Sequence, residues 1–174
     1  ITLETVLVCL EGVASETGMK VHTRDVRRLL DEVRKSDGKR IVLHVDASQM
    51  PLTERIDRSR LGADVLTLDA QKVGGVRGIG VLVRVPSVTL SPQVHGGGQE
   101  QGLRSGTEMP ALAHSFACAL EEAEKQREEF VHRATRMRNE LITFVQKEIA
   151  NVQVNEGKEN APHILNLSFL GRDT

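Results

Sequence analysis

The first 45 residues of the chain follow the order strand, helix, strand, and this order strongly limits the possible fold. Residues 5–10 (TVLVCL) and 41–45 (IVLHV) are short runs of apolar and β-branched residues, as in buried strands. Between them a predicted helix begins at Thr23, and its apolar residues recur at helical spacing: Val26, Leu29, Leu30 and Val33. A strand–helix–strand unit this short predicts two parallel strands joined by a right-handed crossover.

Two more strands are predicted at residues 64–68 and 79–85, on either side of a glycine-rich turn. That turn is too short for a parallel crossover, so these two strands are expected to be antiparallel. The sequence therefore predicts an α/β fold with a mostly parallel sheet.

The longest periodic segment covers residues 108–150 and predicts a long helix. A helix of roughly 40 residues is about 60 Å long at 1.5 Å per residue, which is more than a small domain needs. Such a helix links two domains or breaks once along its length. Residues 152–154 and 164–169 are then two β-like pieces of a second, small α+β domain. Because the chain starts at Ile1 and stops just after that apolar run, we expect a piece of a longer protein.

Composition and charge argue against several classes of function. The 174 residues are 39% hydrophobic and carry 23 basic and 24 acidic side chains, for a net charge of -1. This balance offers no basic footprint for nucleic acid and no polybasic patch for a membrane. The chain has four Phe but no Tyr or Trp, which nearly excludes a stacking surface for single-stranded bases. No apolar run approaches the roughly 20 residues of a membrane-spanning helix.

The two cysteines, Cys9 and Cys118, lie far apart in the sequence and have no metal ligands at suitable spacing. This pattern argues against a disulfide framework and a zinc site, and it favours a reducing compartment, the cytoplasm. Cys9 falls in a predicted strand and Cys118 in the predicted long helix, so both are expected to be small core residues. The six histidines show no paired ligand spacing either, and no metal site is predicted.

Two charged residues follow neighbouring predicted strands. Asp46 comes directly after the strand at 41–45, and Lys72 comes just after the strand at 64–68. By position alone, Asp46 is more often a turn or cap residue, and Lys72 is more often a solvated charge. Together, a carboxylate and a lysine at adjacent strand ends, beside glycines that let a ligand approach, suit a cofactor held as a Schiff base.

Such a cofactor also needs groups that hold its phosphate. Ser105 or Thr107 can cap the predicted long helix, and Ser105 with Glu108 fits a capping box. Hydroxyls at a helix N-terminus bind phosphate well, but plain helix capping is at least as common a role for them.

Several motifs in the chain together resemble the cysteine desulfurases, which are class-V, fold-type-I pyridoxal-phosphate enzymes similar to selenocysteine lyases. The motifs are HVDASQ at 44–49, LDAQK at 68–72, GIG at 78–80, HGGGQE at 95–100 and RSGT at 104–107. They occur in the order and spacing of that family. Residues 162–169 also resemble the opening of its small domain.

The resemblance implies a fold and a division into domains. Residues 1–107 would form the C-terminal part of the cofactor-binding large domain, with the mostly parallel sheet of the fold-type-I enzymes. Residues 108–150 would be the long linking helix, and residues 151–174 the beginning of the small domain.

The resemblance also implies roles for single residues. Lys72 would hold the pyridoxal phosphate as a Schiff base and later move the substrate α-proton. Asp46 would pair with the pyridinium nitrogen, and Gln49 would form a hydrogen bond with the ring 3-oxygen. Thr107 would reach the cofactor phosphate of a neighbouring subunit, which implies a homodimer.

The implied reaction converts L-cysteine to L-alanine and leaves sulfur as a persulfide on an enzyme cysteine. The sulfur would then pass to an acceptor or scaffold protein for iron–sulfur clusters and thio-cofactors. In the family that cysteine belongs to a loop that would lie beyond Thr174, and neither Cys9 nor Cys118 is a candidate for it.

The chain departs from the family pattern close to the lysine. Asp69 stands where the family usually has a serine, and there it would be a like charge beside the phosphate. Gln71 replaces a histidine, although its amide can still bind the cofactor. Ala14 and Ser15 replace two asparagines. A catalytically silent relative that acts as a binding or dimerisation module, or another class-V aminotransferase or lyase, therefore remains an alternative.

Overall fold

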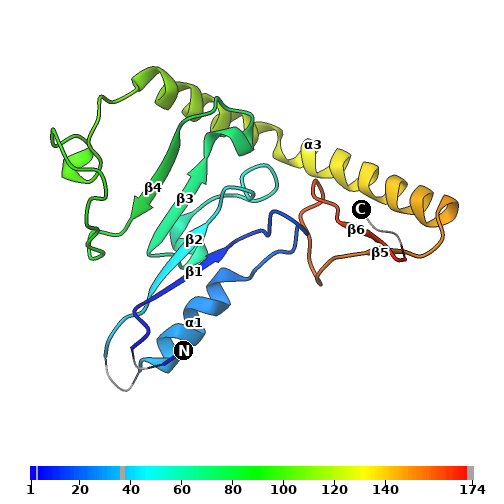
Figure 1. Ribbon diagram of the computed structural model, residues 1–174, viewed down its shortest axis with the longest axis horizontal. Coiled ribbons are helices and arrows are strands. Elements are labelled where there is room, and N and C mark those ends of the chain that lie inside the picture. The colour runs from blue at the N-terminus through cyan, green and yellow to red at the C-terminus, as the bar shows by residue number, and fades with distance from the viewer. Residues whose placement is uncertain (3, 36–37, 172–174) are drawn as a thin grey trace.

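A computed structural model describes residues 1–2, 4–35 and 38–171 of the chain (Figure 1). The elements along the chain are β1 (Leu7–Glu11), α1 (Thr23–Val33), β2 (Val42–Asp46), α2 (Arg58–Leu61), β3 (Val65–Asp69), the 3-10 helix η1 (Ala70–Val73), β4 (Gly80–Arg84), the 3-10 helix η2 (Glu100–Gly102), α3 (Pro110–Glu148), β5 (Val152–Val154) and β6 (Leu167–Phe169).

The strands form two sheets. The larger sheet has the order β1-β2-β3-β4, in which β1, β2 and β3 are parallel and β4 is antiparallel to β3. This arrangement confirms both the predicted parallel pair and the predicted antiparallel pair. The smaller sheet is the antiparallel pair β5-β6, and it lies under the far end of α3 (Figure 1).

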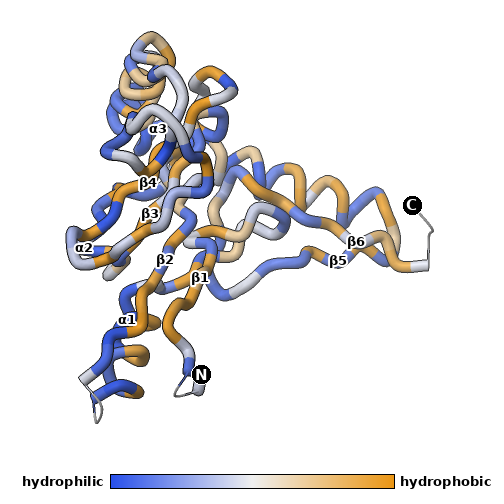
Figure 2. The backbone as a smooth tube through the Cα atoms, turned by 60° about the vertical axis from the view of Figure 1, so that its left-hand side comes forward, coloured by the Kyte–Doolittle hydropathy of each residue, from blue (hydrophilic) through white to orange (hydrophobic). Residues whose placement is uncertain are grey.

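The core lies on one face of the larger sheet. Leu30 of α1 and Phe116 of α3 belong to the same buried cluster as residues of β2 and β3, so both helices cover that face. The strand residues in this cluster are Leu43, Val45, Leu66 and Leu68. Figure 2 shows hydrophobic residues alternating with hydrophilic ones along α3, as expected of a helix with one buried side.

Helix α1 begins at Thr23, as predicted, and it buries part of the predicted apolar face, because Leu30 is 1% exposed and Val26 packs against the core. Leu29 and Val33 are 58% and 48% exposed, whereas Arg27 is only 4% exposed. The apolar periodicity is therefore right for Val26 and Leu30 and wrong for Leu29 and Val33. Arg27 turns inward because its guanidinium finds a buried carboxylate and a backbone carbonyl there.

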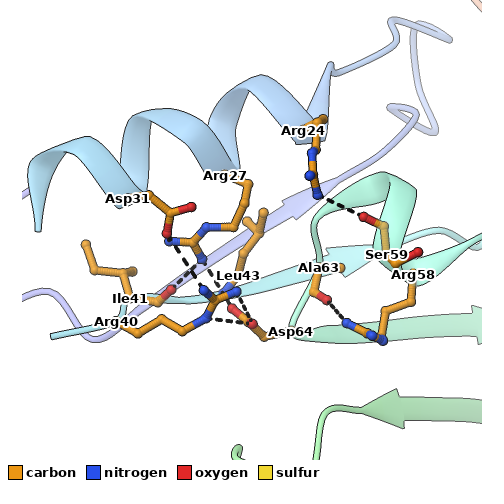
Figure 3. Close-up of polar contacts among 10 residues, drawn as sticks. All are labelled: Arg24, Arg27, Asp31, Arg40, Ile41, Leu43, Arg58, Ser59, Ala63 and Asp64. Carbon is orange, nitrogen blue, oxygen red and sulfur yellow. Dashed lines mark hydrogen bonds and ion pairs between the residues drawn. The ribbon is translucent and has the colours of Figure 1, made fainter. Parts of the chain in front are cut away.

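That carboxylate belongs to Asp64, which directly precedes β3 and is 1% exposed (Figure 3). Asp64 Oδ2 accepts hydrogen bonds from Arg27 Nη1 at 3.2 Å and from the Leu43 backbone N–H at 2.9 Å. Arg40 Nη2 donates to Asp64 Oδ1 at 2.7 Å, and this hydrogen bond raises the pKa of the Arg40 guanidinium. The same Arg27 Nη1 donates to the Ile41 carbonyl at 2.7 Å. These contacts fasten α1 to the N-terminal ends of β2 and β3.

Helix α3 is a single unbroken helix of 39 residues, so it does not break along its length. It begins later than the predicted capping box requires. Its N-cap is Met109, which makes no side-chain capping bond, and Pro110 opens the helix. The ring of Pro110 disfavours a helical backbone at Met109, so the helix cannot extend back to Ser105 or Thr107. The predicted capping box is therefore wrong.

Both cysteines are free, and both are exposed rather than in the core. The prediction that they are small core residues is therefore wrong. Cys9 lies on the side of β1 that points away from the buried cluster, because its neighbours Val8 and Leu10 pack against that cluster. Cys118 lies on an exposed side of α3, with its Sγ 3.7 Å from His114 Nε2.

Among the helices that the structure describes, none combines the length and the hydrophobicity needed to cross a lipid bilayer.

Replacing Asp64 with alanine is expected to lower the free energy of unfolding by about 3–5 kcal/mol, because the buried Arg27 then loses its buried carboxylate partner. Urea denaturation followed by circular dichroism measures this change. The matched control is Asp31→Ala. Asp31 Oδ1 also pairs with Arg27, at 2.7 Å, but its side chain is 53% exposed. The control is expected to cost about 1 kcal/mol or less. Equal losses in the two variants would contradict the organising role of Asp64.

Candidate functional site

The C-terminal ends of β1, β2 and β3 lie side by side at one edge of the larger sheet. In the strand register, Glu11 of β1 is opposite Asp46, and Asp46 is opposite Thr67 of β3. Because the three strands are parallel, the loops that follow them meet at the same edge, where ligands of open α/β sheets bind. Lys72 follows β3 closely, so the structure brings Asp46 and Lys72 to this shared edge.

Asp46 is held firmly at the end of β2. Its carbonyl accepts the Gly12 N–H at 2.8 Å, and the next N–H, of Ala47, donates to the Thr67 carbonyl at 2.9 Å. The Asp46 carboxylate accepts the Ser48 N–H through Oδ1 at 2.9 Å. This turn is the role expected of such an aspartate from its position alone. Within the described residues, however, the second carboxylate oxygen has no hydrogen-bond partner and is available to a ligand.

Lys72 is presented on η1, which is anchored beneath it. Ala70 and Val73 of η1 are buried in the core, while Gln71 and Lys72 are exposed. The Gly75 N–H donates a hydrogen bond to the Ala70 carbonyl at 2.9 Å, and a Cβ at Gly75 would lie 2.9 Å from that oxygen. This glycine therefore serves a tight turn rather than the approach of a ligand. In the part of the chain that the structure describes, Lys72 Nζ forms no hydrogen bond or ion pair.

Asp69, which replaces the usual serine, is engaged with the backbone of η1. Its Oδ1 accepts the Gln71 N–H at 3.0 Å and thereby caps the 3-10 helix. The carboxylate is directed toward the backbone that carries Lys72. Its effect is to fix the turn on which Lys72 stands.

Glu16 is a residue at this edge to which the sequence analysis gave no role. The pKa of Glu16 lies below its usual value, mainly because Ser15 Oγ donates to Glu16 Oε1 at 2.7 Å, with a smaller contribution from the charge of Lys72. The loop of residues 12–20 directly follows β1, so it lies at the same edge of the sheet as Lys72, whose charge acts on Glu16. The sequence signal was the position of this loop directly after β1, at the same edge as Asp46 and Lys72.

The remaining predicted residues lie in two different settings. Gln49 is half-buried in the turn that follows Asp46, close in the chain to the candidate site. Thr107 is exposed on the segment that leads into α3, and among the described residues no interaction joins it to Asp46 or Lys72. Neighbouring Ser105 is 8% exposed and packs against Gly96, where a Cβ would lie 3.0 Å from Ser105 Cβ.

Two cavities lie in the part of the chain that the structure describes, and the smaller one reaches the loops at this edge through Gly12, Val13 and Met50. One of about 630 Å³ lies between Thr53 and the middle of α3, and one of about 300 Å³ lies around the start of α1. Neither of them is lined by Asp46 or Lys72. Within the described ranges there is also no group of three or more His, Cys, Asp or Glu side chains that could hold a metal ion. The candidate site is thus an open edge built around one carboxylate and one amine.

Comparison with known proteins gives a consistent result. The family model for class-V aminotransferases matches residues 1–174. Cysteine desulfurase IscS of Buchnera aphidicola is 36% identical over 176 residues, which cover 97% of this chain and 41% of that protein. Cysteine desulfurase IscS of Proteus mirabilis is 38% identical over 172 residues, which cover 95% of this chain and 40% of that protein.

Solved structures agree with the sequence comparisons. A NifS-like protein superposes with a TM-score of 0.87 at 28% identity, over 97% of this chain and 45% of its own. DndA from Streptomyces lividans superposes with a TM-score of 0.82 at 30% identity, over 100% of this chain and 48% of its own. The chain thus spans less than half the length of these relatives. It belongs to the class-V aminotransferase family of pyridoxal-phosphate-dependent enzymes and is related within that family to the cysteine desulfurases.

Proposed function

We propose that this chain carries the cofactor-holding part of a cysteine desulfurase-like enzyme. One observation supports the proposal above all others. Asp46 and Lys72 stand at adjacent C-terminal strand ends, and each keeps a polar group without a partner in the described structure. A carboxylate oxygen and a primary amine that are held by the fold but left free are suited to a ligand rather than to stability.

The residues at this edge fit the chemistry of pyridoxal phosphate. When bound, this cofactor supplies an aldehyde that a lysine amine holds and a ring that withdraws electrons from an amino acid substrate. Lys72 would hold the aldehyde. Asp46 would place its free carboxylate oxygen beside the ring nitrogen and keep that nitrogen protonated. The amides of Gln49 and Gln71 are the further hydrogen-bonding groups proposed at this edge.

Lys72, Asp46 and Asp69 each have a role in the proposed reaction. Lys72 Nζ moves a proton at the α-carbon of the substrate, because a free primary amine can both accept and donate it. The Asp46 carboxylate keeps its position, since the Ser48 N–H fixes its first oxygen. Asp69 holds the backbone turn of η1, so that Lys72 starts from a fixed point.

The proposed overall reaction takes L-cysteine and an enzyme thiol to L-alanine and an enzyme persulfide. The sulfur leaves the substrate β-carbon, which gains hydrogen, and joins the enzyme thiol. Neither Cys9 nor Cys118 is assigned as that thiol. A sulfur-acceptor protein, such as a scaffold for iron–sulfur clusters, would be the next recipient.

We further propose that Thr107 acts in a homodimer, where its hydroxyl reaches the phosphate of a cofactor held by the neighbouring subunit. Its exposure and its lack of contact with Asp46 or Lys72 in its own chain support this assignment. Residues 1–107, 108–150 and 151–174 would then be part of a large domain, a linking helix and the start of a small domain.

Replacing Lys72 with alanine is expected to abolish covalent binding of pyridoxal phosphate. The measurement is borohydride reduction of the protein with the cofactor, followed by mass spectrometry of the peptides. The unmodified sequence should carry the reduced cofactor on Lys72, and so should the control Lys158→Ala, which changes another exposed lysine. No adduct in the unmodified protein would favour the silent binding module. An adduct without alanine or sulfide from L-cysteine would favour another class-V aminotransferase or lyase.

Replacing Asp46 with asparagine is expected to raise the Kd for pyridoxal phosphate by about tenfold or more, because a charged hydrogen-bond partner is lost. The asparagine oxygen can still accept the Ser48 N–H, so the turn should survive. Fluorescence titration with the cofactor measures the Kd. Asp57→Asn is the matched control, since Asp57 Oδ1 also caps a backbone turn but lies at the start of α2. A similar Kd for the two variants would remove Asp46 from the site.

A further inference from the structure

Residues 156–166, called the strap below, bind the loop of residues 12–20. The Lys20 N–H donates to the Glu159 carbonyl at 2.9 Å, and the Ala161 N–H donates to the Gly18 carbonyl at 2.8 Å. Asn166 Nδ2 donates to the Glu16 carbonyl at 3.1 Å. The strap therefore holds the loop at the edge of Lys72 through bonds to its backbone.

The fit at this contact is close. Ala161 is fully buried, and Gly18 has a φ of +77°. A Cβ on Gly18 would lie 3.0 Å from Ile164 Cβ and 3.1 Å from the Ala161 carbonyl oxygen. The strap is also tied to α3, because Arg138 donates to the Ile164 carbonyl and pairs with Glu156. The strap thus lies between α3 and the loop, and it contacts both.

His163 is the titratable residue at the centre of the strap. Its ring packs edge-on against Phe130 of α3, with 5.7 Å between the ring centroids and an interplanar angle of 62°. Both ring nitrogens are shielded from solvent, and neither has a hydrogen-bond partner among the described residues. A neutral ring is tolerated in this environment, because it buries only one N–H donor and carries no charge. A protonated ring would bury two N–H donors and a positive charge with no acceptor.

The electrostatic surroundings of His163 also favour its neutral form. Burial lowers the pKa of His163, and the positive charge of Lys20 lowers it further. Lys20 itself forms an ion pair with Glu54. On α3, Arg138 donates to the Ile164 carbonyl of the strap and forms an ion pair with Glu156.

We propose that the strap is a pH-sensitive latch, docked on the loop and α3 while His163 is neutral and released when His163 is protonated. The direction of the pH dependence follows from proton linkage. The released state binds the proton more tightly than the docked state, so docking weakens as the pH falls below about 6.5. Above that pH His163 is neutral in both states, so it no longer changes the docking equilibrium.

One other histidine on this contact acts in the opposite sense. His22 Nε2 lies 3.3 Å from Glu159 Oε1, and both side chains are more than half exposed. Protonation of His22 strengthens this ion pair and so favours docking, but an exposed pair of this kind contributes little. The experiment therefore uses a background in which His22 is replaced with glutamine.

Release of the strap would free the loop that carries Glu16 at the edge of Lys72. This consequence for the site rests on the proposed function, whereas the latch itself does not. A mildly acidic environment would then loosen the loop of residues 12–20 at the edge of the candidate site. Asp46 at the end of β2 and Lys72 on η1 would stay in place.

The test is hydrogen exchange of the full chain by NMR between pH 5.5 and 7.5, on the His22→Gln background. The readouts are the protection factors of the Lys20 and Ala161 amides, which donate the two strap bonds. These factors are expected to fall by up to about tenfold per pH unit below about pH 6.5. His163→Phe keeps an aromatic ring against Phe130 but cannot be protonated, so its protection factors should stay constant over this range.

If the protection factors of the Lys20 and Ala161 amides fall by the same amount in His163→Phe, the latch proposal is overturned. The titration of the His163 ring in the unmodified chain gives an independent measurement that needs no variant to fold. A midpoint below 6.5 supports the proposal, and a midpoint at 6.5 or above overturns it. Neither readout depends on cofactor binding, so the failure of the latch and the failure of the proposed function give different results.

Discussion

The buried carboxylate of Asp64 organises the larger sheet. It takes hydrogen bonds from α1 and from β2 at the point where β3 begins, and its partner Arg27 also binds the Ile41 carbonyl. All these contacts lie at the N-terminal ends of β2 and β3. The C-terminal ends of the same strands carry Asp46 and lead to Lys72. The carboxylate oxygen and the amine that have no partner among the described residues are not needed for these contacts. Ligands of open α/β sheets bind at this end of the strands.

The candidate site also depends on distant parts of the chain. Val73 of η1 belongs to the same buried cluster as Phe116 of α3, and the loop of residues 12–20 is bonded to the strap. The position of Lys72 is therefore set by the start of α3, while the loop at the same edge is held by residues near the C-terminal end. Helix α3 connects these two supports as one unbroken rod of 39 residues (Figure 1). This construction lets a titratable residue on the strap, His163, act on a loop at the site.

The errors of the sequence analysis have identifiable causes. Helical periodicity places Leu29 and Val33 inside, but Arg27 takes that side because Asp64 gives it a buried partner. The capping box at Ser105 fails because Pro110 fixes the start of α3. Cys9 is exposed because the covered face of the sheet is the one that Val8 and Leu10 share. In each case a local pattern was overruled by a contact or a steric restriction outside the pattern.

The sequence by itself predicted the parallel pairing of β1 with β2, the antiparallel pairing of β3 with β4, and the placement of Asp46 and Lys72 at adjacent strand ends. These follow from local periodicity and from the short connections between strands, which leave few topologies. Only the tertiary structure decided that the charge of Lys72 acts on Glu16, that the strap holds the Glu16 loop, and that the His163 ring packs against Phe130. The reason is distance along the chain: Asn166 and Glu16 are 150 residues apart, and no local pattern specifies such a contact.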